Sequence, residues 1–301
     1  MIKKKLIDQL RVTPGKKINL NDFDSGWAQT PELKEAGKEA VKQQAAEILE
    51  ANKAELAKAQ ELLWASDIYS VLIVLQAMDA AGKDGIIKHV MSGLNPQGCE
   101  VYSFRKPSAE DTDHNFLWRY MRRLPERGRI GIFNRSYYED VLVVKVHPEL
   151  LKYQQLPPGK RGDGFWQKRY EDINAFEHHL ARNGTLVLKF FLHISKKEQK
   201  KRFLERLENP DKHWKFSEAD LAERAYWDEY QTAFEDALSA TSTKWAPWYV
   251  IPADHKWVSR TLIADILTTS IQSLDLAFPK VSDEKHAALA EAKTHLEQED
   301  S

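Results

Sequence analysis

The chain has 301 residues, of which 42% are hydrophobic and 30% charged, as in folded proteins with a sizeable core. Its 44 Lys and Arg against 45 Asp and Glu exclude a protein that coats nucleic acid or an acidic membrane with its whole surface. The single cysteine, Cys99, excludes an internal disulfide, and no run of about 18 apolar residues could span a bilayer. We expect a cytoplasmic protein without a membrane or nucleic-acid partner, in which any polyanion binds to local basic clusters.

The N-terminal part of the chain favours helices. Residues 31–64 are rich in Ala, Glu, Lys and Leu, with apolar residues at helical spacing, which predicts one or two amphipathic helices. The period then changes, because residues 71–77 form a short apolar run rich in β-branched side chains. Such a run is typical of a strand covered on both faces. A glycine-bearing turn follows, and residues 86–94 again have a helical pattern.

The alternation of strand and helix recurs along the chain. Further strands are predicted at residues 99–104, 129–134, 185–194 and 247–251. Helices are predicted between them at residues 109–124 and 165–184, the second ending at Gly184. Five strands joined by helical crossovers predict an α/β fold, with a parallel sheet sandwiched by helices.

A long polar insertion, residues 196–242, separates the fourth and fifth predicted strands. Pro210 breaks it and a helix restarts at Ser217, so it is long enough to form a helical lid, which we place at about 200–240. The Ala- and Glu-rich end predicts a further helix. We therefore divide the chain into an N-terminal helical extension (1–64), a core with the lid (65–279) and a C-terminal helical tail (280–301).

The stretch LQAMDAAGKDG, residues 75–85, is similar to a phosphate-binding loop in which some positions are replaced. Gly82 and Gly85 permit close backbone approach, Lys83 supplies positive charge, and the turn lies between a predicted strand and a predicted helix. Asp84 stands where a magnesium-binding Ser or Thr is usual, so Mg²⁺ would need other oxygen ligands, of which Asp79 is the nearest. Taken alone, the stretch is equally consistent with an ordinary turn that carries a surface lysine.

Arginines gather around the third predicted strand, at Arg119, Arg122, Arg123, Arg127, Arg129 and Arg135. A solvated helix face explains the first five as well as phosphate contact does. Arg135 differs, because it directly follows the strand at the carboxyl edge, where open α/β sheets bind ligands. Glu139 and Asp140 come one turn later. Asn134 stands where many P-loop enzymes have a metal-supporting aspartate. We therefore expect Asp79 to bind the metal, supported by Glu139 or Asp140.

Five segments in order then form a specific pattern: LQAMDAAGKDG, SFRKPSAED, RGRIGIFNRSYYEDVLVVKVHPE, RLENPDKHWKFSEADLAERAYWDEY and TKWAPWYVIPADHKWVSR. Together they resemble the family-2 polyphosphate kinases over about residues 72–260. The resemblance implies a P-loop fold of the thymidylate-kinase type with a helical lid, and phosphoryl transfer between inorganic polyphosphate and a nucleotide. It also implies Mg²⁺, with Mn²⁺ as the alternative ion, and a homodimer or homotetramer.

The segment around Asn134 and Tyr138-Glu139-Asp140 looks like the class III branch of that family. Members of this branch phosphorylate both AMP and ADP, giving ADP and ATP, so the resemblance implies adenine nucleotides as substrates, with guanine nucleotides as an alternative. The same resemblance assigns catalytic roles, and we expect them at Asp79, Lys83, Arg135, Glu139 and Asp140. Asp79 and Asp140 are the expected metal ligands.

The resemblance also implies two sets of binding residues. The polyphosphate is expected to contact Ala80, Ala81, Gly82, Lys83, Asp84, Gly85, Arg122, Arg123, Arg135, Arg202 and Arg206. The nucleotide is expected to contact Arg105, Lys106, Asn134, Glu139 and Lys212.

Two other functions fit parts of the same pattern. The first is a nucleoside monophosphate kinase with ATP as donor, against which the arginine richness and the missing loop hydroxyl argue. The second is a noncatalytic polyphosphate-binding protein, which would not need carboxylates such as Asp79 and Glu139 beside the phosphates.

Overall fold

Five parallel strands form one sheet in the computed structural model, which describes residues 2–299. The strand order is β2-β3-β1-β4-β5, and every pairing is parallel. The strands are β1 (Ser70–Ala77), β2 (Cys99–Ser103), β3 (Ile130–Asn134), β4 (Thr185–His193) and β5 (Trp248–Pro252). The predicted α/β class and the five predicted strands are confirmed, each within one residue of the expected bounds.

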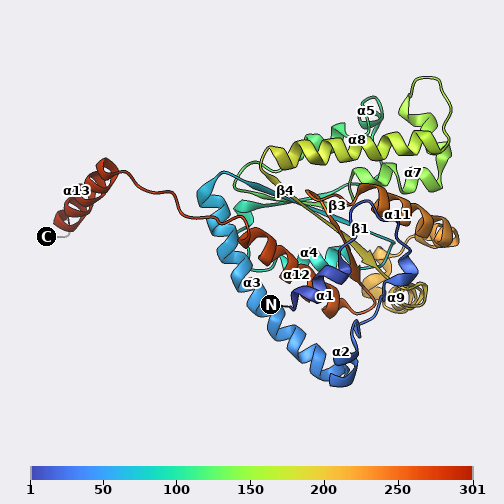
Figure 1. Ribbon diagram of the computed structural model, residues 1–301, viewed down its shortest axis with the longest axis horizontal. Helices are drawn as coiled ribbons and strands as arrows, with labels where there is room; N and C mark the ends of the chain where they lie inside the picture. The colour runs from blue at the N-terminus through green and yellow to red at the C-terminus, as the bar shows by residue number, and fades with distance from the viewer. Residues whose placement is uncertain (1, 300–301) are drawn as a thin grey trace.

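Helices cover both faces of the sheet (Figure 1). One face carries α7 (Val143–Val146), α8 (Asp163–Arg182) and α11 (Trp227–Thr241), and the other carries α3 (Lys38–Ser66), α4 (Lys83–Val90) and α12 (Lys256–Gln272). α12 is buried over most of its surface because it packs between α3 and the sheet. The shorter helices are α1 (Lys4–Leu10), α2 (Pro31–Ala36), α5 (Ala109–Thr112), α6 (Trp118–Met121), α9 (Lys196–Glu208), α10 (Glu218–Glu223) and α13 (Asp283–Glu299), with six 3₁₀ turns among the described residues.

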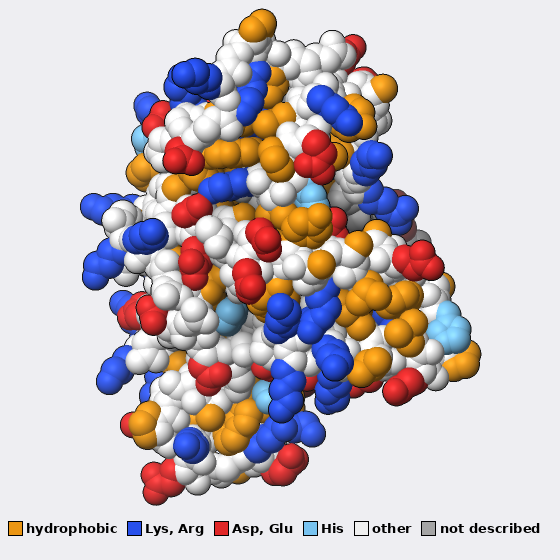
Figure 2. Space-filling view, turned by 90° about the vertical axis from the view of Figure 1, so that its right-hand side faces the viewer, with side chains coloured by type: hydrophobic (Ala, Val, Ile, Leu, Met, Phe, Trp, Pro, Cys, Tyr) orange, Lys and Arg blue, Asp and Glu red, His pale blue; other side chains and the backbone are white. Residues whose placement is uncertain are grey.

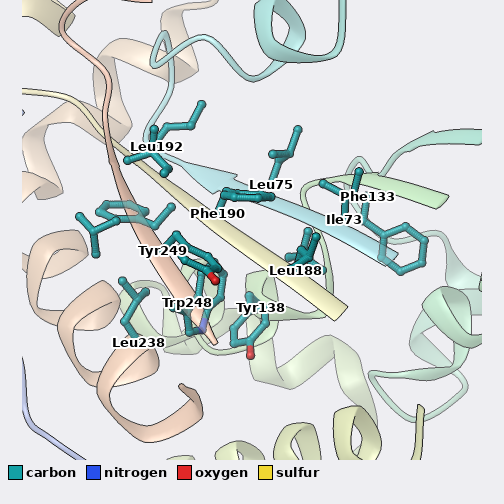
Figure 3. Close-up of a cluster of buried hydrophobic side chains, with 14 of the residues drawn as sticks. Ile73, Leu75, Phe133, Tyr138, Leu188, Phe190, Leu192, Leu238, Trp248 and Tyr249 are labelled. Carbon is teal, nitrogen blue, oxygen red and sulfur yellow. The ribbon is translucent and has the colours of Figure 1, made fainter. Parts of the chain in front are cut away.

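The core lies around the central strands (Figure 3). Ile73 and Leu75 of β1 and Leu188, Phe190 and Leu192 of β4 are almost completely buried. Burying a side chain of this size stabilises the fold by about 1.5–3 kcal/mol relative to exposure. The strand ends are therefore fixed, and the loops that leave the carboxyl edge start from rigid positions.

The N-terminal residues pack into this core rather than standing apart from it. The predicted helices appear as α2 and α3, separated at Gly37, and Leu56 and Leu63 of α3 are buried. Arg11 pairs antiparallel with Tyr249, and the Val12 N–H donates to the Trp248 carbonyl at 2.9 Å. The segment predicted as an extension thus adds a short pairing to the edge of β5.

The prediction of one continuous helix at residues 109–124 was wrong. The structure has two single turns there, α5 and α6, because polar side chains compete for the backbone. Ser108 and Asp111 form a capping box that starts α5, and the Asn115 side chain accepts from the Leu117 N–H. The chain therefore bends between the two turns instead of continuing as one helix.

The polar insertion contains α9, the 3₁₀ turns η5 (Pro210–Lys215) and η6 (Arg224–Tyr226), and α10 between them. We call residues 209–226 the lid segment, and none of its residues is buried. It is shorter than the predicted lid, because α11 buries Trp227, Phe234 and Leu238 in the main core.

α13 lies away from the rest at the end of an extended linker, without buried residues (Figure 1). Within residues 2–299, no helix has the length and apolar character needed to cross a bilayer.

Candidate active site

The loop between β1 and α4 has the shape of a phosphate cradle. Gly82 has φ 111° and Ala80 has φ 63°, both in the left-handed region. Glycine adopts this region freely, whereas Ala80 is held there with its carbonyl accepting from Arg202. α4 begins at Lys83, so its first backbone N–H groups have no acceptor within the helix and lie at its positive end. Phosphate oxygens bind at such a helix start.

Lys83 turns its side chain back over the loop. Its Nζ donates to the Ala77 carbonyl at 3.2 Å. Loss of water contact lowers the pKa of Lys83 and nearby Arg135 lowers it further, whereas Asp79 and other nearby carboxylates raise it. A phosphate in the cavity would act in the same direction as these carboxylates and favour the charged ammonium.

Arg135 joins the ends of β3 and β1. It has φ 65°, and its backbone N–H donates to the Leu75 carbonyl. Its guanidinium donates to Asp79 at 2.8 Å and to Glu139 at 3.2 Å, and Glu139 also accepts from Gln76 at 3.0 Å. Glu139 and Asp79 raise the pKa of Arg135, so the group stays charged. The strand end therefore carries a fixed cation next to the loop.

These groups line a cavity of about 820 Å³ at the carboxyl edge of the sheet. Its lining holds ten Lys and Arg against four Asp and Glu: Lys83, Arg105, Lys106, Arg135, Arg202, Arg206, Lys212, Lys215, Lys256 and Arg260, with Asp79, Asp84, Glu205 and Asp220. Figure 2 looks onto this side of the molecule, and Lys and Arg side chains gather below its centre. A nearly neutral protein thus has a locally basic cavity that suits a ligand with several negative charges.

Comparison with known proteins gives the family. The model of the polyphosphate kinase 2 family matches residues 39–279, which is most of the chain. This chain belongs to the polyphosphate kinase 2 family.

Several members of the polyphosphate kinase 2 family are similar over nearly their whole length. An ADP-polyphosphate phosphotransferase of Rhodopseudomonas palustris is 47% identical over 289 residues, which cover 96% of this chain and 97% of the relative. An AMP/ADP-polyphosphate phosphotransferase of Meiothermus ruber is 46% identical over 270 residues, covering 90% and 94%. The crystal structure of polyphosphate kinase 2 from Arthrobacter aurescens TC1 is 38% identical with a TM-score of 0.83, covering 95% of this chain and 96% of that one. The likeness therefore includes the fold as well as the sequence.

The cavity brings together most of the site residues predicted from the sequence. It is lined by the whole loop from Asp79 to Gly85, by Asn134 and Arg135 at the end of β3, and by Arg105 and Lys106 after β2. From the insertion it receives Arg202, Arg206 and Lys212. Segments that are far apart in the sequence thus meet at one strand edge, as the parallel sheet requires.

Arg202 has a different contact pattern from the one predicted. Its Nε donates to Glu198, its Nη1 to the carbonyls of Ala80 and Ala81, and its Nη2 to the carbonyls of Ala253 and Asp254. All five N–H donors of the guanidinium are therefore directed at protein oxygens. In this structure Arg202 therefore holds the loop from behind, whereas the sequence predicted a phosphate contact here.

Arg122 and Arg123 do not reach the cavity. Arg122 lies 3.7 Å from Glu110 and over the Trp118 ring, and Arg123 lies over the Tyr102 ring. Both cations contact aromatic faces near the β2 edge of the sheet. This placement agrees with the alternative that these arginines belong to a solvated surface. The structure therefore does not support their prediction as phosphate ligands.

Glu139 and Asp140 also differ from their predicted placement. Glu139 supports Arg135 from outside the cavity lining. Asp140 is buried, accepts from Gln154 at 2.8 Å and lies 3.5 Å from Arg169. Burial raises the pKa of Asp140 to about 6, although Arg169 opposes this. The structure thus separates Asp140 from the loop carboxylate Asp79, with which it was predicted to share a metal.

Oxygen donors are available for a divalent ion at the loop. No group of three or more His, Cys, Asp or Glu side chains in residues 2–299 is arranged to hold a metal. Asp79 and Asp84 line the cavity, and Asn134 donates to Asp84 at 2.8 Å while its own amide oxygen is buried without a hydrogen-bond partner. Mg²⁺ characteristically binds through one or two carboxylates and completes its shell with phosphates and water. These residues therefore fit an ion that arrives together with phosphate.

Several lining residues were missed by the sequence interpretation, namely Ser103, Glu205, Asp220, Lys256, Ser259 and Arg260. Lys256 and Arg260 stand one helical turn apart at the start of α12, and Arg260 lies 3.6 Å from where a side chain on Gly85 would begin. A basic pair directly after the fifth strand is a signal that could have identified them, because that strand ends at the same edge as the loop.

Proposed function

We propose that this chain is a polyphosphate-dependent nucleotide kinase, which transfers the terminal phosphoryl group of inorganic polyphosphate reversibly to AMP and ADP. The observation that carries the proposal is the loop of residues 79–85, with Lys83 and Arg135 facing a cavity whose lining is predominantly basic. The names of the similar proteins support it, since one is named for ADP and another for AMP and ADP as partners of polyphosphate. Asn134, which resembles the class III branch of the family, favours both AMP and ADP as acceptors.

The chemistry requires two polyanions to approach each other. Phosphoryl transfer has a loose transition state with charge spread over the equatorial oxygens, so alignment and electrostatic stabilisation supply most of the catalysis. Lys83 and Arg135 neutralise the transferring group, and the N–H groups at the start of α4 hold its neighbour. Mg²⁺, or Mn²⁺ in its place, would be held by Asp79 with phosphate oxygens and would lower the repulsion between donor and acceptor.

A donor and acceptor matrix tests the proposal. Purified protein with Mg²⁺ is given AMP or ADP, each with polyphosphate or with ATP, and the products are separated by anion exchange. Polyphosphate is expected to yield ADP from AMP and ATP from ADP. Transfer from ATP alone would establish the monophosphate kinase instead, and polyphosphate binding without any product would establish the noncatalytic alternative.

Salt should weaken the polymer site more than the nucleotide site. Polyphosphate has no base to recognise, so its affinity depends on repeated Lys and Arg contacts that salt screens. Raising salt from about 50 to about 300 mM should increase the KM for polyphosphate several-fold and the KM for ADP by less than about two-fold. Measuring both constants in the same buffers provides the control. Equal increases would show that the polymer is not held mainly by charge.

The cytoplasmic location and the homodimer or homotetramer remain proposals. The single cysteine suits a reducing compartment. Burial raises the pKa of Cys99 to about 11, so its thiol stays protonated at neutral pH.

A further inference from the structure

Helix α9 holds the phosphate loop by three successive carbonyl groups. Gln199 Nε2 donates to the Asp79 carbonyl at 3.0 Å, and Arg202 Nη1 donates to those of Ala80 and Ala81 at 3.0 and 2.9 Å. Gln199 and Arg202 are three residues apart and so share one face of the helix. Because C=O and N–H point in opposite directions in a trans peptide, these bonds turn the N–H groups of Ala80, Ala81 and Gly82 away from α9, and that of Ala81 donates to the Met78 carbonyl.

Gln199 has a second partner, and this partner belongs to the lid segment. Its Oε1 accepts from Arg224 Nη1 at 2.6 Å, and Arg224 is the first residue of η6. The Gln199 side chain is only 1% exposed, and both ends of its amide are used. A planar amide held at both ends links its partners mechanically. One buried amide thus contacts both the Asp79 carbonyl and the lid-segment residue Arg224.

Other contacts of the lid segment do not provide this link. Arg206 pairs with Asp220 at 3.3 Å, and Glu223 accepts from Tyr230 at 2.6 Å and lies 2.9 Å from a ring nitrogen of His147. These contacts fasten the lid segment to α9, to α11 and to the residue after α7. Among the hydrogen bonds described for residues 2–299, the route through Gln199 is the one that joins the lid segment to a loop carbonyl.

Asp79 is thus restrained from two sides. Arg135 binds its carboxylate at 2.8 Å, and Gln199 binds its carbonyl. Groups that align a phosphoryl transfer must be held within a fraction of an ångström, and a displacement of about 1 Å can reduce the rate about 10²-fold. A loose carbonyl at residue 79 would let both the carboxylate and the next N–H group move.

We propose that Gln199 is a positioning residue for phosphoryl transfer and that Arg224 sets its orientation from the lid segment. The inference rests on the proposed function, because it concerns the same loop. Gln199 touches no reacting atom. It places Asp79 and the Ala80 N–H correctly only while Arg224 occupies its present position, so the lid segment contributes to the geometry of the phosphate loop.

A double-mutant cycle tests the link. Gln199→Met keeps the length of the side chain but removes both hydrogen bonds, and it should lower kcat about 10²-fold with a smaller change in KM for polyphosphate. Arg224→Met should lower kcat about ten-fold, and Arg224→Lys should recover part of this loss because it keeps a donor. The double variant should be no worse than Gln199→Met alone, since both changes break one chain of contacts.

Controls separate positioning from stability. Gln272→Met changes an exposed glutamine at the end of α12, whose contact is a 3.4 Å bond to Glu55, and should leave kcat unchanged. The thermal midpoint of each variant is recorded, and rates are compared well below the lowest midpoint. If buried Gln199→Met does not fold, the half-exposed Arg224→Met decides by itself. Wild-type kcat in folded Arg224→Met would then overturn the link.

The remaining outcomes are also decisive. Additive losses in the double variant, or a higher KM with unchanged kcat, would mean that Arg224 acts on the substrate directly and would overturn the positioning role. The wild-type chain is measured with polyphosphate and with ATP, and the cycle uses the donor that works. Activity with ATP only would overturn the proposed function while the cycle still tests Gln199. If the wild type is active with polyphosphate and the Gln199 and Arg224 variants have the same kcat as the wild type, the positioning role is overturned and the proposed function stands.

Discussion

Lys83→Ala should reduce phosphoryl transfer by about 10²- to 10³-fold while the protein stays folded. Lys83 brings a positive charge to the loop at the start of α4, and the described hydrogen bond of its Nζ is to the Ala77 carbonyl. Alanine is a strong helix former, so the first turn of α4 should persist. The loss should therefore appear in kcat, measured with polyphosphate and ADP, and not in the thermal midpoint.

A lysine on the same helix provides the matched control for this prediction. Lys88 is exposed on α4 and does not line the cavity, so Lys88→Ala removes the same charge from the same element without touching the loop. Its kcat should equal that of the wild type. Near-wild-type turnover in Lys83→Ala would show that the loop is an ordinary turn. Equal losses in both variants would mean that the general charge of α4 matters and not the position of Lys83.

The architecture was predictable because its signals are local. A strand covered on both faces needs a continuous apolar run, so residues 71–77 indicated β1 without knowledge of its neighbours. The loop was recognisable for the same reason: Gly82 and Lys83 lie side by side between a strand and a helix. Parallel order then brings the ends of β1 and β3 together, which placed Arg135 beside the loop.

The direction of individual side chains was not predictable in the same way. Glu139 and Asp140 are neighbours in one 3₁₀ turn, where successive side chains point about 120° apart, so one faces Arg135 and the other faces Arg169. The sequence shows two adjacent carboxylates and does not show which of them faces the loop.

Long-range partners explain the residues that were missed or misread. Gln199 is an uncharged residue in a polar helix, and its partner Asp79 lies 120 positions away. Arg202 has the composition of a phosphate ligand, yet five oxygens of the folded chain occupy its donors. Whether an arginine binds a ligand or the protein depends on oxygens that only folding brings close. These oxygens cannot be identified from the residue type.

The second large effect expected is on stability, at a buried ion pair between strand β4 and helix α8. Lys189 of β4 and Glu177 of α8 are both fully buried, with Nζ and Oε2 2.6 Å apart. Lys189 also donates to Tyr138 and to the Thr241 carbonyl, and Glu177 accepts from Tyr137 and Tyr138. Burial lowers the pKa of Lys189, and the carboxylate of Glu177 opposes this. The pair is satisfied only while both members are present.

Removing one member should therefore destabilise the fold strongly. Lys189→Met leaves a buried carboxylate without its cation, and Glu177→Gln leaves a buried ammonium without its anion, and each should lower the free energy of unfolding by about 3–5 kcal/mol. The double variant removes both charges and keeps an amide oxygen for the tyrosines. Its loss should fall short of the sum of the single losses by at least about 1 kcal/mol.

Urea unfolding of the four proteins measures this coupling. Lys58→Met, in the exposed Lys58–Glu55 pair of α3, is the control and should leave the midpoint unchanged, because water already solvates both charges. Tyr137 and Tyr138, which bind Glu177, lie in the sequence between the site residues Arg135 and Glu139. Loss of either member of the ion pair should therefore also lower kcat in the single variants. Single variants as stable as the wild type would show that the surrounding dipoles, rather than the opposite charge, compensate each buried ion. Additive losses would show that the two charges act independently although they lie in contact.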